Sequence, residues 1–379
     1  MGIWPVVRVV FILALLVSGC AAPAPIRLGF AGQLSGAQSD LGIQGRDAAL
    51  LAVEDVNAAG GVAGRPLELV AQDDLGTPAG AVAGDQALMQ AGVVAIIGHM
   101  TSAQTLAGLA VTEPAGMLLF SPTTSASQLT GEDDLFFRVI SSVNDLAAAL
   151  SQYTLTDRHL RRLAIVLDGD NAGYSRPFAD AFSASLEAGG GAVVERLEIS
   201  AAARPDWAAH LPALRAAAPD GLLLIMSAVE AAFFAQQTRL SGWEVPLFSS
   251  PWAQTEALLE AGGSAVEGMV FSSPYDIANP APLFRDFQRR YQERFGREAG
   301  FAAAMTYESV RLLAAALETT RGAPAGLPAA LRQLPARDIL GNVLALNRYG
   351  DVVRPIALVT VQAGAFASLG TVTLPIVAR

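Results

Sequence analysis

One strand–turn–helix–strand unit constrains the fold of this chain more than any other stretch of its sequence. Val93–Ile97 is a short apolar run rich in β-branched residues, which is typical of a parallel strand covered on both faces. Gly98 ends that run, and Ser102 occupies the position expected for the N-cap of the following helix. Met117–Phe120 is a second apolar run. The pattern predicts a βαβ unit and therefore a parallel sheet.

Hydroxyl-bearing residues follow both predicted strands of this unit. Ser102 comes after the first strand, and the run Ser121–Ser125, with the sequence Ser-Pro-Thr-Thr-Ser, follows the second. In an open α/β sheet, ligands bind in the crevice beyond the carboxyl ends of the strands. A helix N-terminus in that crevice presents backbone N–H groups that favour an anion. The sequence therefore predicts a site for a small anion, most simply a carboxylate, and a capping role for Ser102 is compatible with it.

The same alternation of strands and helices recurs in two successive sets along the chain. Strands of the first set are expected at Ile26–Phe30, Pro66–Gln72, Val93–Ile97, Met117–Phe120 and Phe136–Val139. Strands of the second set are expected at Leu163–Leu167, Ala192–Ile199, Leu222–Met226, Val245–Ser249 and Met269–Ser272. Intervening helices include Ala79–Ala91, Pro177–Ala188, Asp206–Ala217 and Glu230–Leu240, and Pro282–Phe295 and Phe301–Thr320 come later. Two such sets predict two α/β lobes around a cleft.

The N-terminus predicts the compartment in which the protein works. Residues 1–20 combine one positive charge at Arg8, an apolar core over residues 9–17 and the ending Val-Ser-Gly-Cys. The apolar core is too short for a permanent membrane span, so the segment is predicted to be a signal peptide. Its ending is similar to that of bacterial lipoprotein signals, in which the cysteine becomes the lipidated first residue. Cys20 is the only cysteine, and we expect it to carry a lipid anchor, with residues 21–25 as a tether.

Composition and motifs argue against nucleic acid binding and against catalysis. The formal net charge is −10, whereas a protein that binds nucleic acid needs a basic surface. The sequence contains no P-loop, nucleophile-elbow or zincin motif. Its three histidines are scattered and supply no obvious metal site. We therefore expect a binding protein with no cofactor and no metal, and not an enzyme.

Seven short motifs, in order along the chain, give the sequence its family resemblance. They are Leu34–Gly36, Asn57–Glu68, Asp73-Asp74, Ile97–His99, Ser121–Ser125, Ala164–Asp168 and Phe295-Gly296. With them the chain resembles the periplasmic leucine/isoleucine/valine-binding proteins, which are type I substrate-binding components of ABC transporters. The resemblance implies an α/β fold of two doubly wound parallel-sheet lobes, joined by three crossovers, with a ligand cleft between them. It places residues 26–142 and 275–350 in the first lobe, and residues 143–274 and 351–379 in the second.

The resemblance also assigns roles to residues of the predicted cleft. Ser102 matches the serine that holds the ligand's carboxylate in that family. Thr123 matches a position that contributes mainly backbone contacts, and Ser125 matches a hydroxyl-bearing position beside it. Tyr174 matches an aromatic residue that closes over the ligand from the second lobe. Three of these positions agree with the anion site expected from the strand ends alone.

Three positions depart from the family pattern. Trp252 stands where amino-acid binders carry a glutamate that pairs with the ligand's ammonium group. Leu41 replaces a tyrosine of the first lobe, and Ser227 replaces a tyrosine of the second. We still expect all three residues to contact the ligand.

The replacement by Trp252 leaves two classes of ligand open. Enclosing an ammonium group without a counter-charge costs several kcal/mol, and a cation–π contact returns only about 0.5–2 kcal/mol. In the first alternative another acid takes the role of the glutamate, and the candidates are Glu230, Asp276 and Asp168. In the second, the ligand has no ammonium and is an aromatic or aliphatic carboxylate, or a small amide.

Together these features predict a solute-binding lipoprotein outside the cytoplasm. We expect it to be a monomer in the cell envelope, held at the membrane by its lipid anchor, and to deliver an apolar amino acid or a related carboxylate to the permease subunits of an ABC importer. The alternative is a sensor that passes ligand binding to a membrane receptor or kinase.

Overall fold

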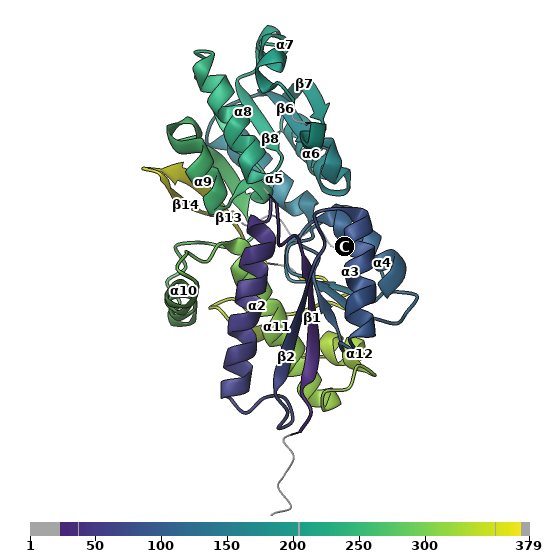
Figure 1. The fold of residues 1–379 in the computed structure, drawn as a ribbon. Helices are drawn as coiled ribbons and strands as arrows, with labels where there is room; N and C mark the ends of the chain where they lie inside the picture. Colours follow the sequence, from purple (N-terminus) through teal and green to yellow (C-terminus); the bar gives the residue numbers. More distant parts are fainter. Residues whose placement is uncertain (1–22, 37, 204, 353, 373–379) are drawn as a thin grey trace, which may run out of the picture.

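The computed structural model describes residues 23–36, 38–203, 205–352 and 354–372, and it shows two α/β lobes stacked end to end (Figure 1). The predicted signal peptide with Cys20, residues 21–22 of the predicted tether and the last seven residues of the predicted second lobe lie outside the described residues. Within the described residues, no helix is long and apolar enough to cross a membrane.

The first lobe is built on a sheet of five parallel strands in the order β2-β1-β3-β4-β5. Its strands are β1 (Ile26–Gly32), β2 (Leu67–Asp73), β3 (Ile96–Ile97), β4 (Leu119–Ser121) and β5 (Phe136–Arg138). Its helices are α2 (Asp40–Ala58), α3 (Pro78–Gln90), α4 (Ser102–Thr112), α10 (Pro282–Phe295), α11 (Phe301–Thr320) and α12 (Leu327–Arg332), and β11 (Arg337–Asp338) pairs with β12 (Val343–Leu344). The predicted βαβ unit is therefore present, with strands shorter than expected.

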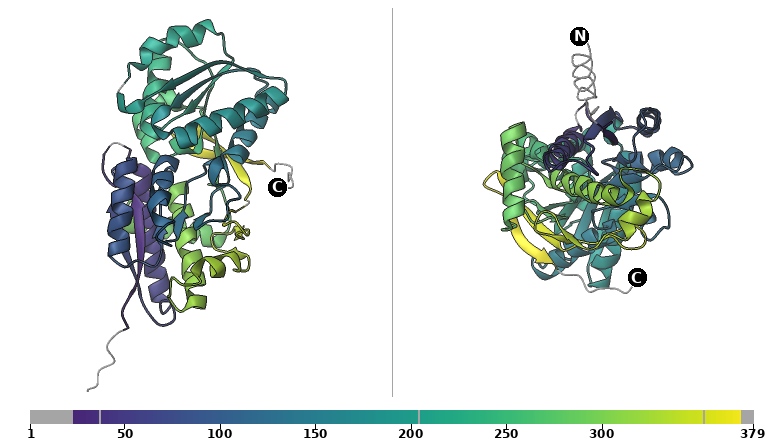
Figure 2. Two further views of the ribbon diagram at one scale, coloured as in Figure 1. Left: turned by 90° about the vertical axis from the view of Figure 1, so that its right-hand side faces the viewer. Right: turned by 90° about the horizontal axis from the view of Figure 1, so that it is seen from below.

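Both faces of this sheet are buried, as the apolar strand sequences predicted. Ile97 and Phe120 belong to one hydrophobic core together with residues of α2 and α11. Ile96 and Leu119, their neighbours in the chain, belong to a second core with residues of α3 and α4. Successive side chains of a strand point to opposite faces, so two consecutive strand residues contribute one side chain to each core. The views of Figure 2 show helices on both sides of the strands.

The second lobe contains a sheet of seven strands in the order β14-β13-β10-β9-β8-β6-β7. Its strands are β6 (Arg162–Asp168), β7 (Ala192–Ile199), β8 (Gly221–Ile225), β9 (Leu247–Ser249), β10 (Val270–Ser273), β13 (Ile356–Gln362) and β14 (Ala365–Val372). Its helices are α5 (Val143–Thr156), α6 (Ala172–Ala188), α7 (Leu211–Ala216), α8 (Ala228–Leu240) and α9 (Glu256–Gly262). Five of these strands run parallel, and β13 and β14 extend the sheet as an antiparallel hairpin.

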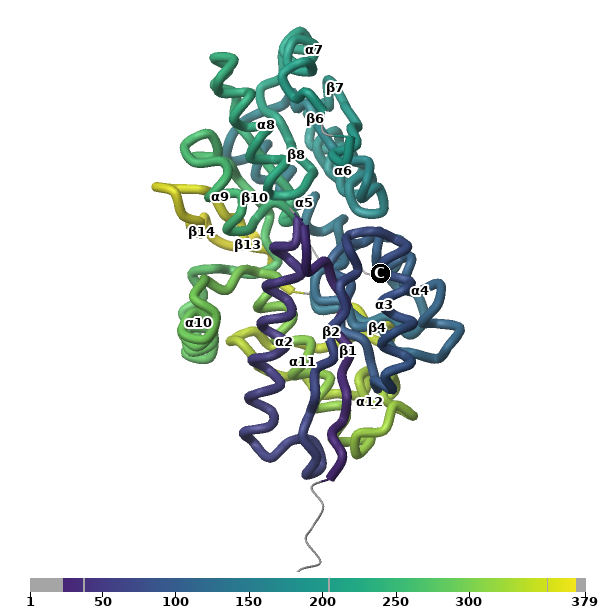
Figure 3. The backbone as a smooth tube through the Cα atoms, in the orientation of Figure 1, coloured from purple at the N-terminus to yellow at the C-terminus, as the bar shows by residue number. Residues whose placement is uncertain are grey.

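The chain passes between the lobes three times, as the backbone tube of Figure 3 lets the reader follow. It leaves the first sheet after β5, returns after β10, and leaves again between β12 and β13. At the first of these passages Val143 donates a backbone hydrogen bond to the carbonyl of Ser125, at 2.9 Å. The loop that carries the predicted anion-binding hydroxyls is thus attached directly to a connection between the lobes.

Candidate functional site

A cavity of about 340 Å³ lies where the two lobes meet. Its polar lining consists of Thr101, Ser102, Thr123, Ser125, Asn171 and Tyr174. Its apolar lining consists of Leu41, Met100, Ile140, Leu146, Pro251, Trp252 and Phe301. Residues of both lobes contribute to this lining. Six of the seven residues predicted to contact ligand are therefore brought together here.

Ser102 forms the first-lobe wall of the cavity at the start of α4. The N-cap of this helix is Thr101, so the prediction of Ser102 as the cap is wrong by one residue. The extended backbone of Thr101 places Ser102 in the first helical turn, and the Thr101 side chain makes no capping hydrogen bond. Ser102 is 2% exposed, and its hydroxyl forms no hydrogen bond with any described residue. A free hydroxyl at a helix N-terminus is suited to an anion.

The loop after β4 supplies two more hydroxyls, which differ in their partners. Thr123 Oγ1 donates to the carbonyl of Met100 at 2.7 Å, so this hydroxyl is already used to hold the loop. Ser125 is 1% exposed, and its Oγ is buried with no hydrogen-bond partner among the described residues. A buried polar group without a partner is costly. Ser125, rather than Thr123, is therefore the hydroxyl of this loop that is free to bind a ligand.

Tyr174 and Trp252 form the second-lobe wall. Their rings meet edge to face, with centroids 5.8 Å apart and an interplanar angle of 86°. Trp252 also packs against the hydrophobic cores of both lobes, so it is at once a cleft wall and a packing residue. Burial raises the pKa of the Tyr174 hydroxyl. Ser250 and the backbone of Trp252 lie close enough to lower that pKa, but the hydroxyl makes no hydrogen bond of normal geometry.

The local structure around Tyr174 differs from the prediction. The helix expected to begin at Pro177 begins at Ala172, so Tyr174 lies in the first turn of α6 and not in a loop. Pro177 lies inside this helix, where its missing N–H group removes one intrahelical hydrogen bond. Tyr174 is consequently held on a helix, and the centroid of its ring lies 5.8 Å from the ring centroid of Phe178.

Ser227 is the one predicted contact residue that does not line the cavity. It occupies the N-cap of α8, directly after β8, and is 3% exposed. The serine side chain is short, and its buried Oγ reaches no partner among the described residues. The geometry does not support the predicted ligand contact at Ser227, because this residue does not line the cavity. The tyrosine that the family resemblance implies at this position has a much longer side chain than serine.

None of the three candidate acids lines the cavity either. Asp168 accepts hydrogen bonds from the backbone N–H groups of Asp170, at 2.9 Å, and Ala201, at 3.2 Å. Burial nevertheless raises the pKa of the Asp168 carboxyl to about 6. Burial and the neighbouring charge of Asp168 also raise the pKa of Glu230. The carboxylate of Asp276 accepts from the N–H of Ala278 at 3.0 Å. Among the residues that the structure describes, these carboxylates serve their own loops and helices.

Two contacts between the lobes were not predicted from the sequence. Asn171 Oδ1 accepts a hydrogen bond from the backbone N–H of Ala103, in the first turn of α4, at 3.1 Å. The carboxylate of Asp40, at the start of α2, accepts a hydrogen bond from the hydroxyl of Thr255. Both link residues that are far apart in the sequence, so no local pattern reveals them. They hold the two walls of the cavity against each other.

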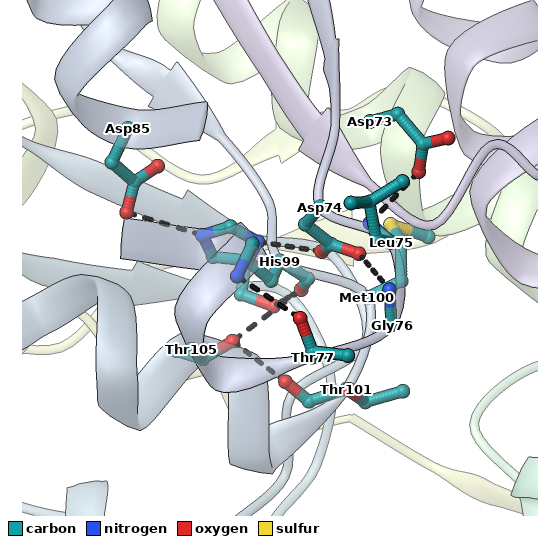
Figure 4. Close-up of polar contacts among 12 residues, drawn as sticks. Asp73, Asp74, Leu75, Gly76, Thr77, Asp85, His99, Met100, Thr101 and Thr105 are labelled. Carbon is teal, nitrogen blue, oxygen red and sulfur yellow. Dashed lines mark hydrogen bonds and ion pairs between the residues drawn. The ribbon is translucent and has the colours of Figure 1, made fainter. Parts of the chain in front are cut away.

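Beneath the first-lobe wall lies a buried cluster of charged residues around His99 (Figure 4). His99 Nδ1 lies 2.7 Å from Asp74 Oδ2, and Nε2 lies 3.1 Å from Asp85 Oδ2. Burial alone lowers the pKa of His99, but the hydrogen bonds and charges of the two aspartates outweigh it and raise the pKa to about 9. At neutral pH the histidine is therefore a cation between two anions. A Cβ at Gly108 of α4 would stand 2.4 Å from Asp85 Oδ2, so a glycine is needed there.

The His99 cluster supports the loops of the cavity through the backbone. The carbonyl of His99 accepts from Ser121 Oγ at 2.7 Å, and Ser121 Oγ in turn accepts from the N–H of Thr124 at 2.9 Å. These bonds fix the loop that carries Ser125. The bonds around His99 therefore give it a structural role in the first lobe.

The described part of the chain contains no group of three or more histidine, cysteine, aspartate or glutamate side chains placed to hold a metal ion. The polar groups of the cavity are hydroxyls, an amide and the N–H groups of a helix start. This set of groups suits hydrogen bonding to an anion.

A family model described as periplasmic binding protein matches residues 25–365. The chain therefore belongs to the periplasmic binding protein family. The Leu/Ile/Val-binding protein of Escherichia coli is 26% identical over 309 residues, which are 80% of this chain and 82% of the relative. The predicted resemblance to the leucine/isoleucine/valine-binding proteins is thereby confirmed.

Solved structures confirm the predicted two-lobed type I fold. The branched-chain amino acid transporter substrate binding protein LivJ of Streptococcus pneumoniae, solved with isoleucine, has a TM-score of 0.85 at 22% identity, over 92% of this chain and 99% of its own. A solute binding protein of an ABC transporter from Rhodopseudomonas palustris, solved with 3,4-dihydroxybenzoic acid, has a TM-score of 0.82 at 21% identity, over 92% of this chain and 97% of its own. At these identities the likeness shows the fold alone.

Proposed function

We propose that this protein is an extracytoplasmic solute-binding lipoprotein that captures a small carboxylate-bearing ligand for an ABC importer. One observation carries the proposal: the hydroxyls of Ser102, Ser125 and Tyr174 line one interlobe cavity, and those of Ser125 and Tyr174 are buried without hydrogen-bond partners among the described residues. The start of α4 adds the positive end of a helix dipole to the same wall. A bound carboxylate would satisfy these groups, and the apolar lining would enclose the rest of the ligand.

The two lobes allow the ligand to be bound and enclosed without any covalent step. Ligand binds first to the wall formed by Ser102 and Ser125. Tyr174 and Trp252 then close over it, because the closed state gains contacts with both walls only when ligand bridges them. The permease recognises the closed form. The described residues that line the cavity include no acidic residue, histidine, lysine or cysteine, and we propose binding and not catalysis.

The relatives support the transport assignment. The neighbours solved with isoleucine and with 3,4-dihydroxybenzoic acid are both described as binding components of transporters, and no feature of this chain favours a sensor. The same fold thus encloses an amino acid in one protein and an aromatic acid in another. Fold alone therefore leaves open whether the ligand of this chain is an apolar amino acid or a related carboxylate or amide.

The proposed anchor is Cys20, and the proposed working form is a monomer at the outer face of a membrane. Changing Cys20→Ser should leave ligand binding intact and move the protein from the membrane fraction to the soluble fraction of cells. A wild-type protein that is already soluble and carries no lipid would contradict the anchor.

A thermal-shift titration of the chain beginning at Ala21 tests the proposed function. The panel holds aliphatic and aromatic carboxylates, apolar amino acids, small amides and nucleosides. A ligand at 100 times its Kd adds about 2.7 kcal/mol to the free energy of unfolding, which raises the melting temperature measurably. We expect at least one carboxylate to do so. Stabilisation by nucleosides or amides alone, with no response to any carboxylate, would contradict the proposal.

A further inference from the structure

The lining of the cavity contains donors for a carboxylate, but among the described residues it contains no anionic group to pair with an ammonium. Of the described residues that line it, none is acidic. Ser102, Ser125 and Tyr174 each have a hydroxyl that can donate. Asn171 uses its Oδ1 to accept from Ala103, which leaves its side-chain NH2 group, another donor, at the cavity. Every free polar side chain of the lining can thus donate to an anion.

The acidic side chains nearest to the cavity are already paired. A second hollow shares Leu41, Met100, Thr101 and Trp252 with the cavity and reaches Asp74. The carboxylate of Asp74, however, bonds to His99 at 2.7 Å and to the N–H of Gly76 at 2.9 Å. A carboxylate that balances a buried histidinium is not available to a ligand's ammonium without leaving the histidinium unpaired.

Asp40, near the same cleft, is engaged across the lobes. Its carboxylate accepts from the hydroxyl of Thr255 and so holds α2 of the first lobe to the start of α9 in the second. Backbone acceptors at the cavity wall are engaged as well. The carbonyl of Met100 accepts from Thr123 Oγ1 at 2.7 Å, and the carbonyl of Ser125 accepts from the N–H of Val143 at 2.9 Å.

Trp252 is an uncharged, tightly packed wall of the cavity. The edge-to-face contact with Tyr174 and the packing against both cores fix its ring in this place. An ammonium enclosed beside this ring would gain only a cation–π contact. It would lose its hydration without gaining a paired charge. The balance is against any ligand that carries an ammonium group.

We propose that the ligand is a monocarboxylate with an apolar, aliphatic or aromatic body and no ammonium group, and that Trp252 determines this specificity. The proposal rests on the proposed function and narrows its ligand class. Ser102, Ser125 and the start of α4 bind the carboxylate. Trp252, Tyr174 and Leu41 enclose the body of the ligand and exclude the α-amino acid of the same shape.

Calorimetric titration with matched pairs of compounds tests the proposal. Each pair differs only in the ammonium group: 4-methylpentanoate against leucine, and 3-phenylpropanoate against phenylalanine. We expect the deaminated acid of at least one pair to bind more than about tenfold tighter than its amino acid, because the uncompensated ammonium costs more than 1.4 kcal/mol.

The outcomes separate this proposal from the proposed function. Equal or tighter binding of the amino acids would overturn the ligand class and leave the solute-binding function standing. If no member of either pair and no other carboxylate of the panel binds, the solute-binding function fails and this proposal fails with it.

The variant Trp252→Glu tests the role of the tryptophan, with Phe233→Glu as its control. Phe233 is 45% exposed on α8, so its replacement adds the same charge away from the cavity. We expect Trp252→Glu to weaken 4-methylpentanoate binding more than about tenfold and to strengthen leucine binding relative to wild type, through a new ion pair with the ammonium. Unchanged preference in a folded Trp252→Glu protein would overturn the role of Trp252. The wild-type titrations decide the ligand class even if this variant does not fold.

Discussion

Two groups of buried polar side chains lie at the carboxyl end of the first sheet, and they differ in how many of their hydrogen bonds are made. In the His99 cluster, both ring nitrogens of His99 are paired with aspartates, and the carbonyl of His99 accepts from Ser121. In the cavity wall, by contrast, the hydroxyl of Ser125 in the loop after β4 has no partner among the described residues.

This difference indicates which polar groups stabilise the fold and which are available to bind a ligand. Buried polar groups are nearly always hydrogen-bonded in native proteins, and a satisfied network adds rigidity. In the His99 cluster only Asp85 Oδ1 is buried without a partner among the described residues, and the cluster positions the loop that ends at Ser125. Hydroxyls that remain unpaired in a cavity between lobes are instead the groups a ligand can satisfy. The first group thus stabilises the loops of the first lobe, and the second forms the binding site that these loops position.

The largest effect should come from breaking the His99 cluster. Changing His99→Gln leaves Asp74 and Asp85 facing each other without the cation, and we expect the free energy of unfolding to fall by about 3–5 kcal/mol. Urea denaturation of the chain beginning at Ala21 measures it. Glu68→Gln, which breaks the exposed pair between Arg27 and Glu68, should cost no more than about 1 kcal/mol. Equal losses in the two variants would contradict the comparison.

The pH dependence of the free energy of unfolding should reflect the raised pKa of His99 in the same cluster. The folded-state pKa of His99 is raised to about 9, above the value of about 6.5 expected in the unfolded chain. The stabilisation is therefore complete below pH ~6.5 and is lost as the pH rises through the folded-state pKa. Denaturation between pH 6.5 and 9.5 should show a loss on the order of 3 kcal/mol. A flat profile would mean that His99 is not charged in the native state.

A smaller effect, on binding and not on folding, is expected at the cavity wall. Ser102→Ala removes one donor to the ligand's carboxylate and should weaken binding of the best carboxylate by roughly 1–3 kcal/mol. Calorimetry provides the measurement. Ser183→Ala is the control, since Ser183 Oγ donates to the carbonyl of Ala179 on α6. Full affinity in Ser102→Ala would remove Ser102 from the anion site.

The smallest effect should come from a contact between the lobes. Asn171→Ala removes the hydrogen bond to the N–H of Ala103 and should weaken ligand binding by about 1 kcal/mol, mainly through faster dissociation, because the closed state loses one bond. Stopped-flow fluorescence gives the two rates. A slower association with unchanged dissociation would show that Asn171 acts before closure.

The fold was predictable because its signals are local. Apolar runs such as Leu163–Leu167 have the length and composition of buried strands, and the glycine and serine residues between elements mark their ends. The positions of Ser102 and Ser125 followed from the same reasoning, since the carboxyl ends of neighbouring parallel strands meet at one edge. Ser102, Thr123 and Ser125 line the cavity for this reason, whereas Leu41, Tyr174 and Trp252 line it at positions that the family resemblance assigned.

The rest depends on contacts that a single sequence does not reveal. Asn171 meets Ala103 only because two lobes close on each other. The start of α6 at Ala172 is set by tertiary packing around Tyr174, which overrides the break that Pro177 suggested. Ser227 was assigned by resemblance alone, and a short side chain at the position of a tyrosine does not extend into the cavity.

A crystal structure of the chain beginning at Ala21, grown with 4-methylpentanoate, would show whether the unpaired hydroxyls bind a carboxylate. We expect the acid in the cavity between the lobes, with its carboxylate about 3 Å from Ser102 Oγ and Ser125 Oγ and its apolar end against Trp252 and Leu41. The His99 cluster should keep all of its bonds. A carboxylate bound elsewhere, with Ser102 and Ser125 still unpaired, would rule out the proposed binding site.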